Sequence, residues 1–255
     1  MLEMIINELN SRGYKAEAHK KIKNGVEIEG IIMLTGSNVQ PVMYVHDDLS
    51  VLENVDLIID QYERHKDLNF DINQVLDKEF VLSHLYISLQ KESNEDIIKK
   101  PTEFEGIEQY LEICYGEYSI KLTKVFAEQI GLDEEAWEHA GRNTFAKTTI
   151  KSLTEQIREM GYNVLDWGMD MIVMSNKKIF KGASAILDKK ALKKLSEKLG
   201  VSKFFVMPSS VHEMMLIPCD DESKLDMYSN LVKEVNYTQV DPVDRLTDRA
   251  YILEI

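Results

Sequence analysis

The sequence has no long apolar run and only two cysteines among its 255 residues. A helix that crosses a bilayer needs about 20 consecutive apolar residues, and no run comes near that length. Cys114 and Cys219 are too few for a disulfide framework. The first ten residues, MLEMIINELN, place Glu3 and Glu8 within a helical apolar pattern, which a secretory signal lacks. These absences predict a soluble cytoplasmic protein that does not bind membranes.

The common catalytic and cofactor motifs are also missing. The chain contains no Walker loop, no G-x-G-x-x-G, no G-x-S-x-G and no C-x-x-C. The segment HEMML, which starts at His212, has Leu216 where a zincin needs its second histidine. No cofactor is therefore predicted.

Length and composition are those of a folded protein. A chain of 255 residues with 44% hydrophobic and 29% charged residues is large enough for one large or two modest domains. It lies outside the low-hydrophobicity, high-charge range in which chains stay disordered. We expect it to fold without a partner.

Charge is distributed unevenly along the chain. Residues 1–160 hold 17 Lys and Arg against 30 Asp and Glu, whereas residues 161–255 hold 13 against 14. Residues 176–203 contain nine lysines and only two acidic residues. Because nucleic-acid backbones are bound first through Lys and Arg, the acidic front half disfavours direct nucleic-acid binding.

The N-terminal region predicts a small antiparallel sheet followed by a helix. Apolar and polar residues alternate from residue 14 to 22 and from 26 to 29, and Asn24-Gly25 between them is a strong hairpin signal. After a turn at 35–38, the segment PVMYV (41–45) predicts a third strand, with Pro41 at its start. A helix is predicted at about 50–66, where Ser50 and Glu53 fit a capping box.

The middle of the chain predicts a mixed, helix-rich region. Residues 71–92 are compatible with a helix, with a strand as the competing interpretation for VLSHLYISL. The polar run 91–106 predicts an exposed connection. Further helices are expected after Asp133 and over residues 149–161, the latter ending at Gly161.

The C-terminal region has the clearest pattern, with the predicted order β-β-α-β-β-α-β. Its predicted elements are MIVMS, GASAILD, the helix DKKALKKLSEKLG, FFVMP, EMMLIP, a helix at about 222–236 and AYILEI. Strand pairs that alternate with single helices predict an α+β protein with an antiparallel sheet and helices on one face. The sequence thus divides into an N-terminal α+β region (1–100), a helix-rich middle (101–161) and a C-terminal α+β domain (162–255).

A group of polar residues lies between two apolar runs in FFVMPSSVHEMMLIP. Ser209, Ser210, His212 and Glu213 are the catalytic candidates there, since serine, histidine and carboxylate together form hydrolase sites. Two apolar runs separated by a few turn-forming residues also predict a plain hairpin. We favour the hairpin, with its polar residues bonded to local backbone groups.

Two further groups have both a functional and a structural interpretation. His46, Asp47 and Asp48 follow a strand and precede a helix, so they could hold a metal ion; an acidic helix start is the interpretation we favour. Lys189, Lys190, Lys193 and Lys194 lie on the polar side of an amphipathic helix. They form either a solvated face, which is the default, or a binding surface for an acidic partner.

Several segments together resemble a known family. These are KNGVEIEGIIMLTGSNVQPVMYV, VMSNKKIFKGASAILD, FFVMPSSVHEMMLIP and VKEVNYTQVDPVDRLTDRAYILE, of which PSSVHE and VNYTQV are the most specific. The chain resembles an uncharacterised bacterial family of unknown function, number 5688 in that series, which is common in clostridial gut bacteria. The resemblance implies a bacterial intracellular protein and brings no activity, cofactor or site residue with it.

Three functional hypotheses follow from the sequence. We favour a non-catalytic binding or regulatory protein that presents the basic helix 189–200 and the turn 208–213 to a protein partner; a homo-oligomer stays open. The first alternative is a hydrolase at the Pro208–Glu213 hairpin. The second is an acidic protein whose front half imitates nucleic acid and blocks a DNA-binding protein.

Overall fold

The computed structural model describes residues 1–34, 42–66, 72–115, 118–163 and 171–255. The turn expected at 35–38 and Pro41 lie outside these residues. The chain groups into two compact units, Met1–Asn73 and Gln74–Ile255, and each is described separately. In the described ranges no helix has both the length and the apolar character needed to cross a membrane.

The first unit packs a small sheet against helices, as the sequence predicts. Its elements are α1 (Leu2–Ser11), β1 (Ala16–Lys23), β2 (Val26–Met33), β3 (Val42–Tyr44), α2 (Val51–His65) and the beginning of α3 (Ile72–Leu76).

Local sequence signals shape this unit. Strands β1, β2 and β3 pair antiparallel in that order. Asn24 and Gly25 turn the first hairpin with φ of 51° and 76°, the left-handed conformations of a type I′ turn. Ser50 and Glu53 form the predicted capping box at the start of α2.

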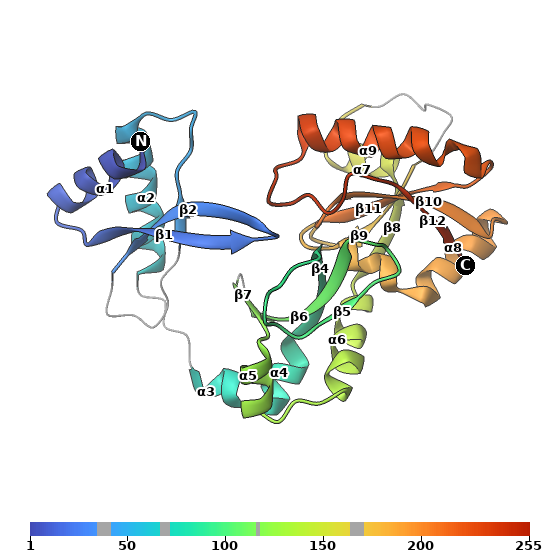
Figure 1. Ribbon diagram of the computed structural model, residues 1–255, viewed down its shortest axis with the longest axis horizontal. Helices are drawn as coiled ribbons and strands as arrows, with labels where there is room; N and C mark the ends of the chain where they lie inside the picture. The colour runs from blue at the N-terminus through green and yellow to red at the C-terminus, as the bar shows by residue number, and fades with distance from the viewer. Residues whose placement is uncertain (35–41, 67–71, 116–117, 164–170) are drawn as a thin grey trace. The chain divides into compact units, whose positions relative to one another are not determined.

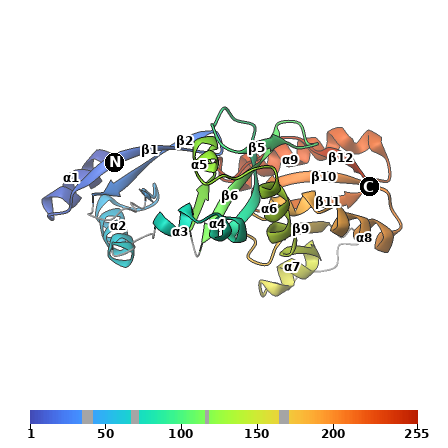
Figure 2. The same cartoon turned by 90° about the horizontal axis from the view of Figure 1, so that it is seen from below.

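The described residues of the second unit form two antiparallel sheets, which Figures 1 and 2 show from two directions. The first, here called the middle sheet, is built around a long strand and is followed by helices. Its part of the chain comprises α4 (Lys78–His84), β4 (Leu85–Lys91), β5 (Lys99–Pro101), β6 (Ile107–Tyr115), β7 (Tyr118–Lys121), α5 (Lys124–Gln129) and α6 (Glu135–Phe145). Strand β6 lies at its centre, with β4 on one side and β5 and β7 on the other.

The other sheet, here called the C-terminal sheet, has the strand order β12-β10-β11-β9-β8. Its part of the chain comprises β8 (Thr148–Ser152), α7 (Leu153–Glu159), β9 (Ile172–Asn176), the 3-10 helix η1 (Ala183–Leu187), α8 (Lys189–Leu199), β10 (Lys203–Ser210), β11 (Glu213–Pro218), η2 (Glu222–Lys224), α9 (Leu225–Gln239) and β12 (Tyr251–Glu254). The α+β class is confirmed, and the described strands pair antiparallel.

The structure corrects the position of the C-terminal helices. They were expected on one face of the sheet, but α8 packs on one face and α9 on the other (Figure 1). The reason lies in strand β10, where Phe204 and Val206 face the core under α8 while Phe205 and Met207 face α9. A strand that is apolar on both faces needs cover on both faces.

The predicted second strand, GASAILD, is wrong: residues 183–187 form the 3-10 helix η1. An unbroken run of small and apolar residues does not distinguish a buried strand from a short buried helix. Here the N–H groups of Gly182 and Ala183 donate to the carbonyls of His212 and Val211. The hairpin turn therefore binds the start of this segment through backbone hydrogen bonds, and the segment does not pair with a strand of the sheet.

The sheet gains a strand from a segment predicted as helix. Residues 149–161 were expected to be helical, yet 148–152 form β8, which pairs with β9. Thr148, Thr149 and Ile150 are β-branched and favour a strand. A capping box of Ser152 and Glu155 then starts α7 at Leu153.

The middle of the chain contains more strand than predicted. Residues 107–115 form β6, and VLSHLYISL is helix up to His84 and strand from Leu85. The stretch 91–106, expected to be exposed, includes strand β5 and the buried Ile97 and Phe104.

Candidate functional site

The β10–β11 hairpin confirms the turn predicted from FFVMPSSVHEMMLIP. Ser210 pairs with Glu213, so Val211 and His212 form the turn. The His212 N–H donates to Ser210 Oγ at 3.1 Å. The hydroxyls of Ser209 and Ser210 each lie 3.4 Å from Glu213 Oε1. These polar groups bond to one another within the turn.

Both ring nitrogens of His212 have partners. The Lys181 N–H donates to Nδ1 at 3.1 Å, and Nε2 lies 3.3 Å from Asp244 Oδ2. Because Nδ1 accepts a hydrogen bond, the ring proton is on Nε2 and points to Asp244. A serine nucleophile needs a base within hydrogen-bond reach. Among the described residues, neither Ser209 nor Ser210 has such a bond to the His212 ring.

His212 also holds the loop that precedes η1. Its carbonyl accepts from the Gly182 N–H at 3.0 Å and from Ser175 Oγ at 2.7 Å. A Cβ at position 182 would lie 2.8 Å from that carbonyl and 2.7 Å from the Asn176 nitrogen. Only glycine fits this close approach of backbones.

His46, Asp47 and Asp48 lie at the turn between β3 and α2. The His46 N–H donates to Asn54 Oδ1 at 2.8 Å, and Asn54 Nδ2 donates to the His46 carbonyl at 2.9 Å. Asn54 is fully buried, so these bonds fasten the turn to the helix. The described residues contain no group of three or more His, Cys, Asp or Glu side chains arranged to hold a metal ion.

One face of the middle sheet carries buried charges that the sequence analysis did not single out. Glu108 and Glu112 are 5% and 1% exposed. Lys99 Nζ lies 3.1 Å from Glu108, and Lys181 Nζ lies 2.5 Å from Glu112. Each buried carboxylate thus has its own lysine, together with hydroxyl or amide donors that include Ser88 and Gln90. A network of this kind, in which each buried carboxylate is paired, joins the strands of the sheet.

The spacing of Glu108 and Glu112 on one strand face was the available sequence signal for this network. Lys99 is 9 positions from Glu108 along the chain, and Lys181 is 69 positions from Glu112. The spacing of the glutamates alone therefore does not identify their lysine partners.

The network changes the acidity of neighbouring groups. Burial and then the Glu112 charge raise the pKa of Cys114 to about 12. Burial raises the pKa of Tyr110 well above its usual range. Burial alone would also raise the pKa of Glu108, but hydrogen bonds from Gln90, Ser93 and Lys99 outweigh it and lower that pKa. Cys114 is therefore a protonated, unreactive thiol at neutral pH.

The basic helix α8 forms as predicted. Asp188 caps its start by accepting from the Ala191 N–H at 3.0 Å, and Gly200 ends it in the left-handed conformation. Leu192 and Leu195 are buried in the core, and the four predicted lysines are exposed. The first turn contains no acidic residue but two lysines, Lys189 and Lys190. Lysines there oppose the positive end of the helix dipole, so they do not stabilise the helix.

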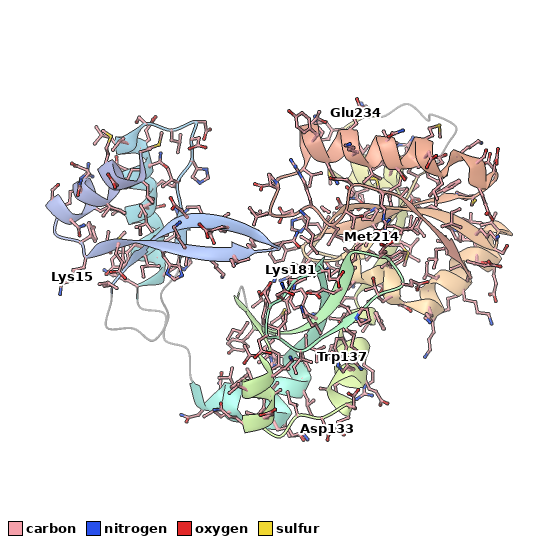
Figure 3. The ribbon with its side chains drawn as sticks, viewed as in Figure 1. Lys15, Asp133, Trp137, Lys181, Met214 and Glu234 are labelled. Carbon is pink, nitrogen blue, oxygen red and sulfur yellow. The ribbon has the colours of Figure 1, made fainter. Side chains whose placement is uncertain are left out.

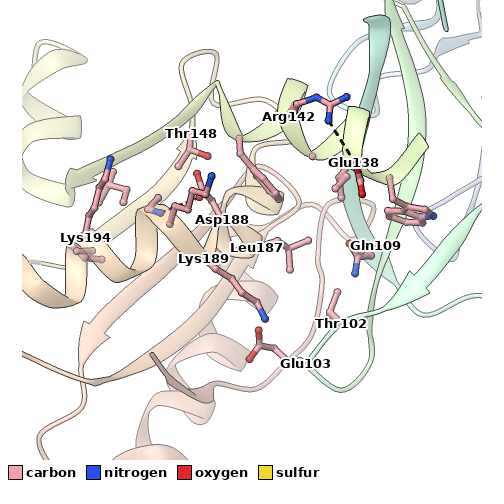
Figure 4. Close-up of a pocket in the computed structure, with 18 of the residues that line it drawn as sticks. Thr102, Glu103, Gln109, Glu138, Arg142, Thr148, Leu187, Asp188, Lys189 and Lys194 are labelled. Atoms are coloured by element: carbon pink, nitrogen blue, oxygen red, sulfur yellow. Dashed lines mark hydrogen bonds and ion pairs between the residues drawn. The ribbon is translucent and has the colours of Figure 1, made fainter. Parts of the chain in front are cut away.

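A groove of about 1200 Å³ runs beside α8 (Figure 4). Its walls come from α6, from the β5 edge, from β8 and from α8 itself, and its floor includes Ile87 and Leu187. Trp137, on α6 (Figure 3), contributes a large aromatic surface. The groove lies entirely within the second unit.

The side chains that line the groove carry more positive than negative charge. The cations are Lys100, Lys189, Lys190, Lys194, Lys198 and Arg142, and the carboxylates are Glu103, Glu138 and Asp188. Lys100 pairs with Glu134 at 2.9 Å, and Arg142 lies 3.9 Å from Glu138. Figure 4 shows Lys189 extending toward Glu103. The four lysines of α8 in the groove have no ion pair within the described part of the chain.

Only three of the four lysines predicted from the sequence as a binding surface line the groove. Lys189, Lys190 and Lys194 line the groove, whereas Lys193 does not. Lys198, Lys100, Arg142 and Trp137 join them from elements that the sequence analysis did not connect. Lys190, Lys194 and Lys198 are four residues apart and form one row along the helix.

Comparisons with known proteins identify one relationship. No curated protein and no solved structure matches the chain. The model of a family of unknown function, DUF5688, matches residues 1–254. Because that match spans nearly the whole sequence, the chain belongs to the DUF5688 family.

Proposed function

We propose that this chain is a binding protein whose groove beside α8 takes an anionic ligand. The observation that carries the proposal is the row Lys190, Lys194 and Lys198, whose charges face the groove without ion pairs in the described residues. Like charges four residues apart destabilise a helix. The row therefore does not stabilise the helix, and a bound anion would relieve its repulsion.

The size and lining of the groove support a ligand of some length. Pockets for small molecules usually enclose about 300–1000 Å³, and this groove of about 1200 Å³ is larger than that. Apolar side chains such as Trp137, Phe145 and Ile150 lie beside the cations. Such a lining suits a ligand with both anionic and apolar groups.

The net charge of −14 on the whole chain does not prevent such binding. Charges interact over about 10 Å at ordinary ionic strength, so the nearby lysines dominate the potential inside the groove. The overall acidity reduces non-specific attraction of polyanions elsewhere on the surface.

The experiment is a calorimetric titration of the full chain with each of two probes, inorganic tripolyphosphate and a heptaglutamate peptide. The paired substitutions Lys190→Gln and Lys194→Gln should weaken binding by roughly tenfold, because each exposed ion pair contributes up to about 1 kcal/mol. Lys193→Gln, outside the groove on the same helix, is the matched control. Failure of both probes to bind, or equal weakening by the control, would refute the proposal.

A further inference from the structure

One wall of the groove is the open edge of a sheet. Strand β8 is the last strand of the C-terminal sheet, and it pairs only with β9 in the strand order of the described residues. Its side chains are all partly exposed. Thr148 and Ile150 line the groove beside α8.

The hydrogen-bond register determines which backbone groups of β8 point outward. The Leu153 N–H donates to the Met171 carbonyl at 2.7 Å, so Leu153 and Met171 form a hydrogen-bonded pair. Such pairs alternate along an antiparallel ladder. Thr149 and Lys151 therefore bond to β9, and the N–H and C=O groups of Thr148, Ile150 and Ser152 point away from it.

Two of these outward residues lack backbone partners in the described part of the chain. The Ser152 N–H donates to Glu155 within the capping box. No partner is found for the N–H of Thr148 or Ile150 among the residues described. The Thr148 hydroxyl is also buried and has no hydrogen-bond partner in the described ranges. An unpaired strand edge is a template for a further strand.

The lysine row follows the same edge. The first groove brings Thr148 and Ile150 together with Lys190 and Lys194. A second hollow, of about 560 Å³, brings Ile150 and Ser152 together with Lys198. The order of residues along β8 thus matches the order along α8, and the two hollows share Ile150 and Lys198.

The spacing of the lysines on α8 matches the spacing of side chains on an extended peptide paired with β8. Lysines four residues apart on a helix rise by about 6 Å. Side chains on one face of an extended strand recur about every 6.8 Å. A peptide with acidic residues at alternate positions would therefore offer one carboxylate per lysine while its backbone pairs with β8.

We propose that the ligand is an extended acidic peptide that adds a strand to the β8 edge and places alternate carboxylates on Lys190, Lys194 and Lys198. This inference rests on the proposed function and specifies its ligand. Peptides recognised in this way gain affinity from backbone hydrogen bonds and specificity from alternate side chains. A nucleic acid has no backbone that pairs with a strand edge, so it is the less suited polyanion.

The test compares four acetylated, amidated heptapeptides by calorimetry on the full chain. The first is Glu-Val-Glu-Val-Glu-Val-Glu, and the second has the same composition as a block of four Glu and three Val. The third and fourth are the alternating peptide with N-methyl groups on the backbone nitrogens of the valines or of the glutamates.

We expect the alternating peptide to bind at least tenfold more tightly than the block peptide, and one N-methylated version to lose at least tenfold, because each lost backbone hydrogen bond weakens binding several-fold. Ile150→Pro removes one outward N–H without breaking a bond to β9. It should weaken the binding of the alternating peptide and leave the binding of the block peptide unchanged. The methylated peptides test the same bond in the unaltered protein if this variant does not fold.

The outcomes separate this inference from the proposed function. If tripolyphosphate, the block peptide and both methylated peptides bind as tightly as the alternating one, and all depend on Lys190 and Lys194, the anion groove stands and strand addition is overturned. Tighter binding of a single-stranded oligothymidylate would also overturn it. If nothing binds in a manner that depends on these lysines, both proposals fail.

Discussion

Substitution of Lys194 by glutamine should stabilise the folded protein while it weakens ligand binding. Lys194 lies four residues from both Lys190 and Lys198 and three residues from Glu197, and none of the three lysines has an ion pair in the described ranges. Each like-charge pair at this spacing destabilises a helix by about 0.2–0.5 kcal/mol. Glutamine and lysine have nearly equal helix propensity, so the repulsion is the main difference.

The substitution removes two repulsive pairs and one attractive pair, so it should raise the free energy of unfolding by about 0.2–0.5 kcal/mol. For a domain of the size of the second unit, this corresponds to a Tm increase of roughly 0.5–2 °C. Urea denaturation followed by circular dichroism measures the first quantity, and calorimetry the second. The gain should shrink in about 0.5 M salt, where exposed charges are screened.

Lys193→Gln tests the same reasoning at a neighbouring position. Lys193 has Lys189 and Lys190 four and three residues before it and Glu197 four residues after it, so it too has one more repulsive than attractive pair. We expect a gain in unfolding free energy of similar size, up to about 0.5 kcal/mol, but no loss of ligand binding. A destabilised Lys194→Gln or Lys193→Gln protein would contradict the reasoning, since these lysines would then contribute to the fold.

Two further predictions concern the buried network of the middle sheet. Lys181→Met should lower the free energy of unfolding by about 3 kcal/mol because it leaves the buried Glu112 without its cation. The double variant with Glu112→Leu should regain most of that loss. If the double variant regains no stability, loss of the ion pair is not the cause. The pKa of Cys114, raised to about 12, makes stability depend on pH in a defined direction. The unfolded thiol loses its proton near pH 8.5, so stability from this group is present below that pH and is lost as pH rises toward 12. Urea titrations at a series of pH values should show a smaller loss for Cys114→Ala, and an equal loss would refute the assignment.

The local elements were the most predictable part of this protein. Asn24-Gly25 turns the first hairpin because both residues tolerate positive φ, and Ser50 with Glu53 caps α2 because both groups lie within one helical turn. Asp188 and Gly200 mark the ends of α8 for the same kind of reason. Each of these signals involves residues only a few positions apart.

The errors occurred where distant residues decide the conformation. The segment GASAILD fits a strand by composition, but bonds to the hairpin turn around His212 make it a 3-10 helix. Residues 148–152 join a sheet because β9 lies beside them, although the helical pattern of α7 begins immediately afterwards.

The sequence by itself determined the α+β class, the two hairpins, the start of α2, and the ends and basic character of α8, because spacing and short-range chemistry specify these features. Only the tertiary structure decided which lysines face the groove, that Lys193 is excluded from it, and that an open strand edge lies opposite the lysine row. Those features depend on how α6, β5, β8 and α8 are placed around the groove, and the placement of segments so far apart is not encoded in any local pattern.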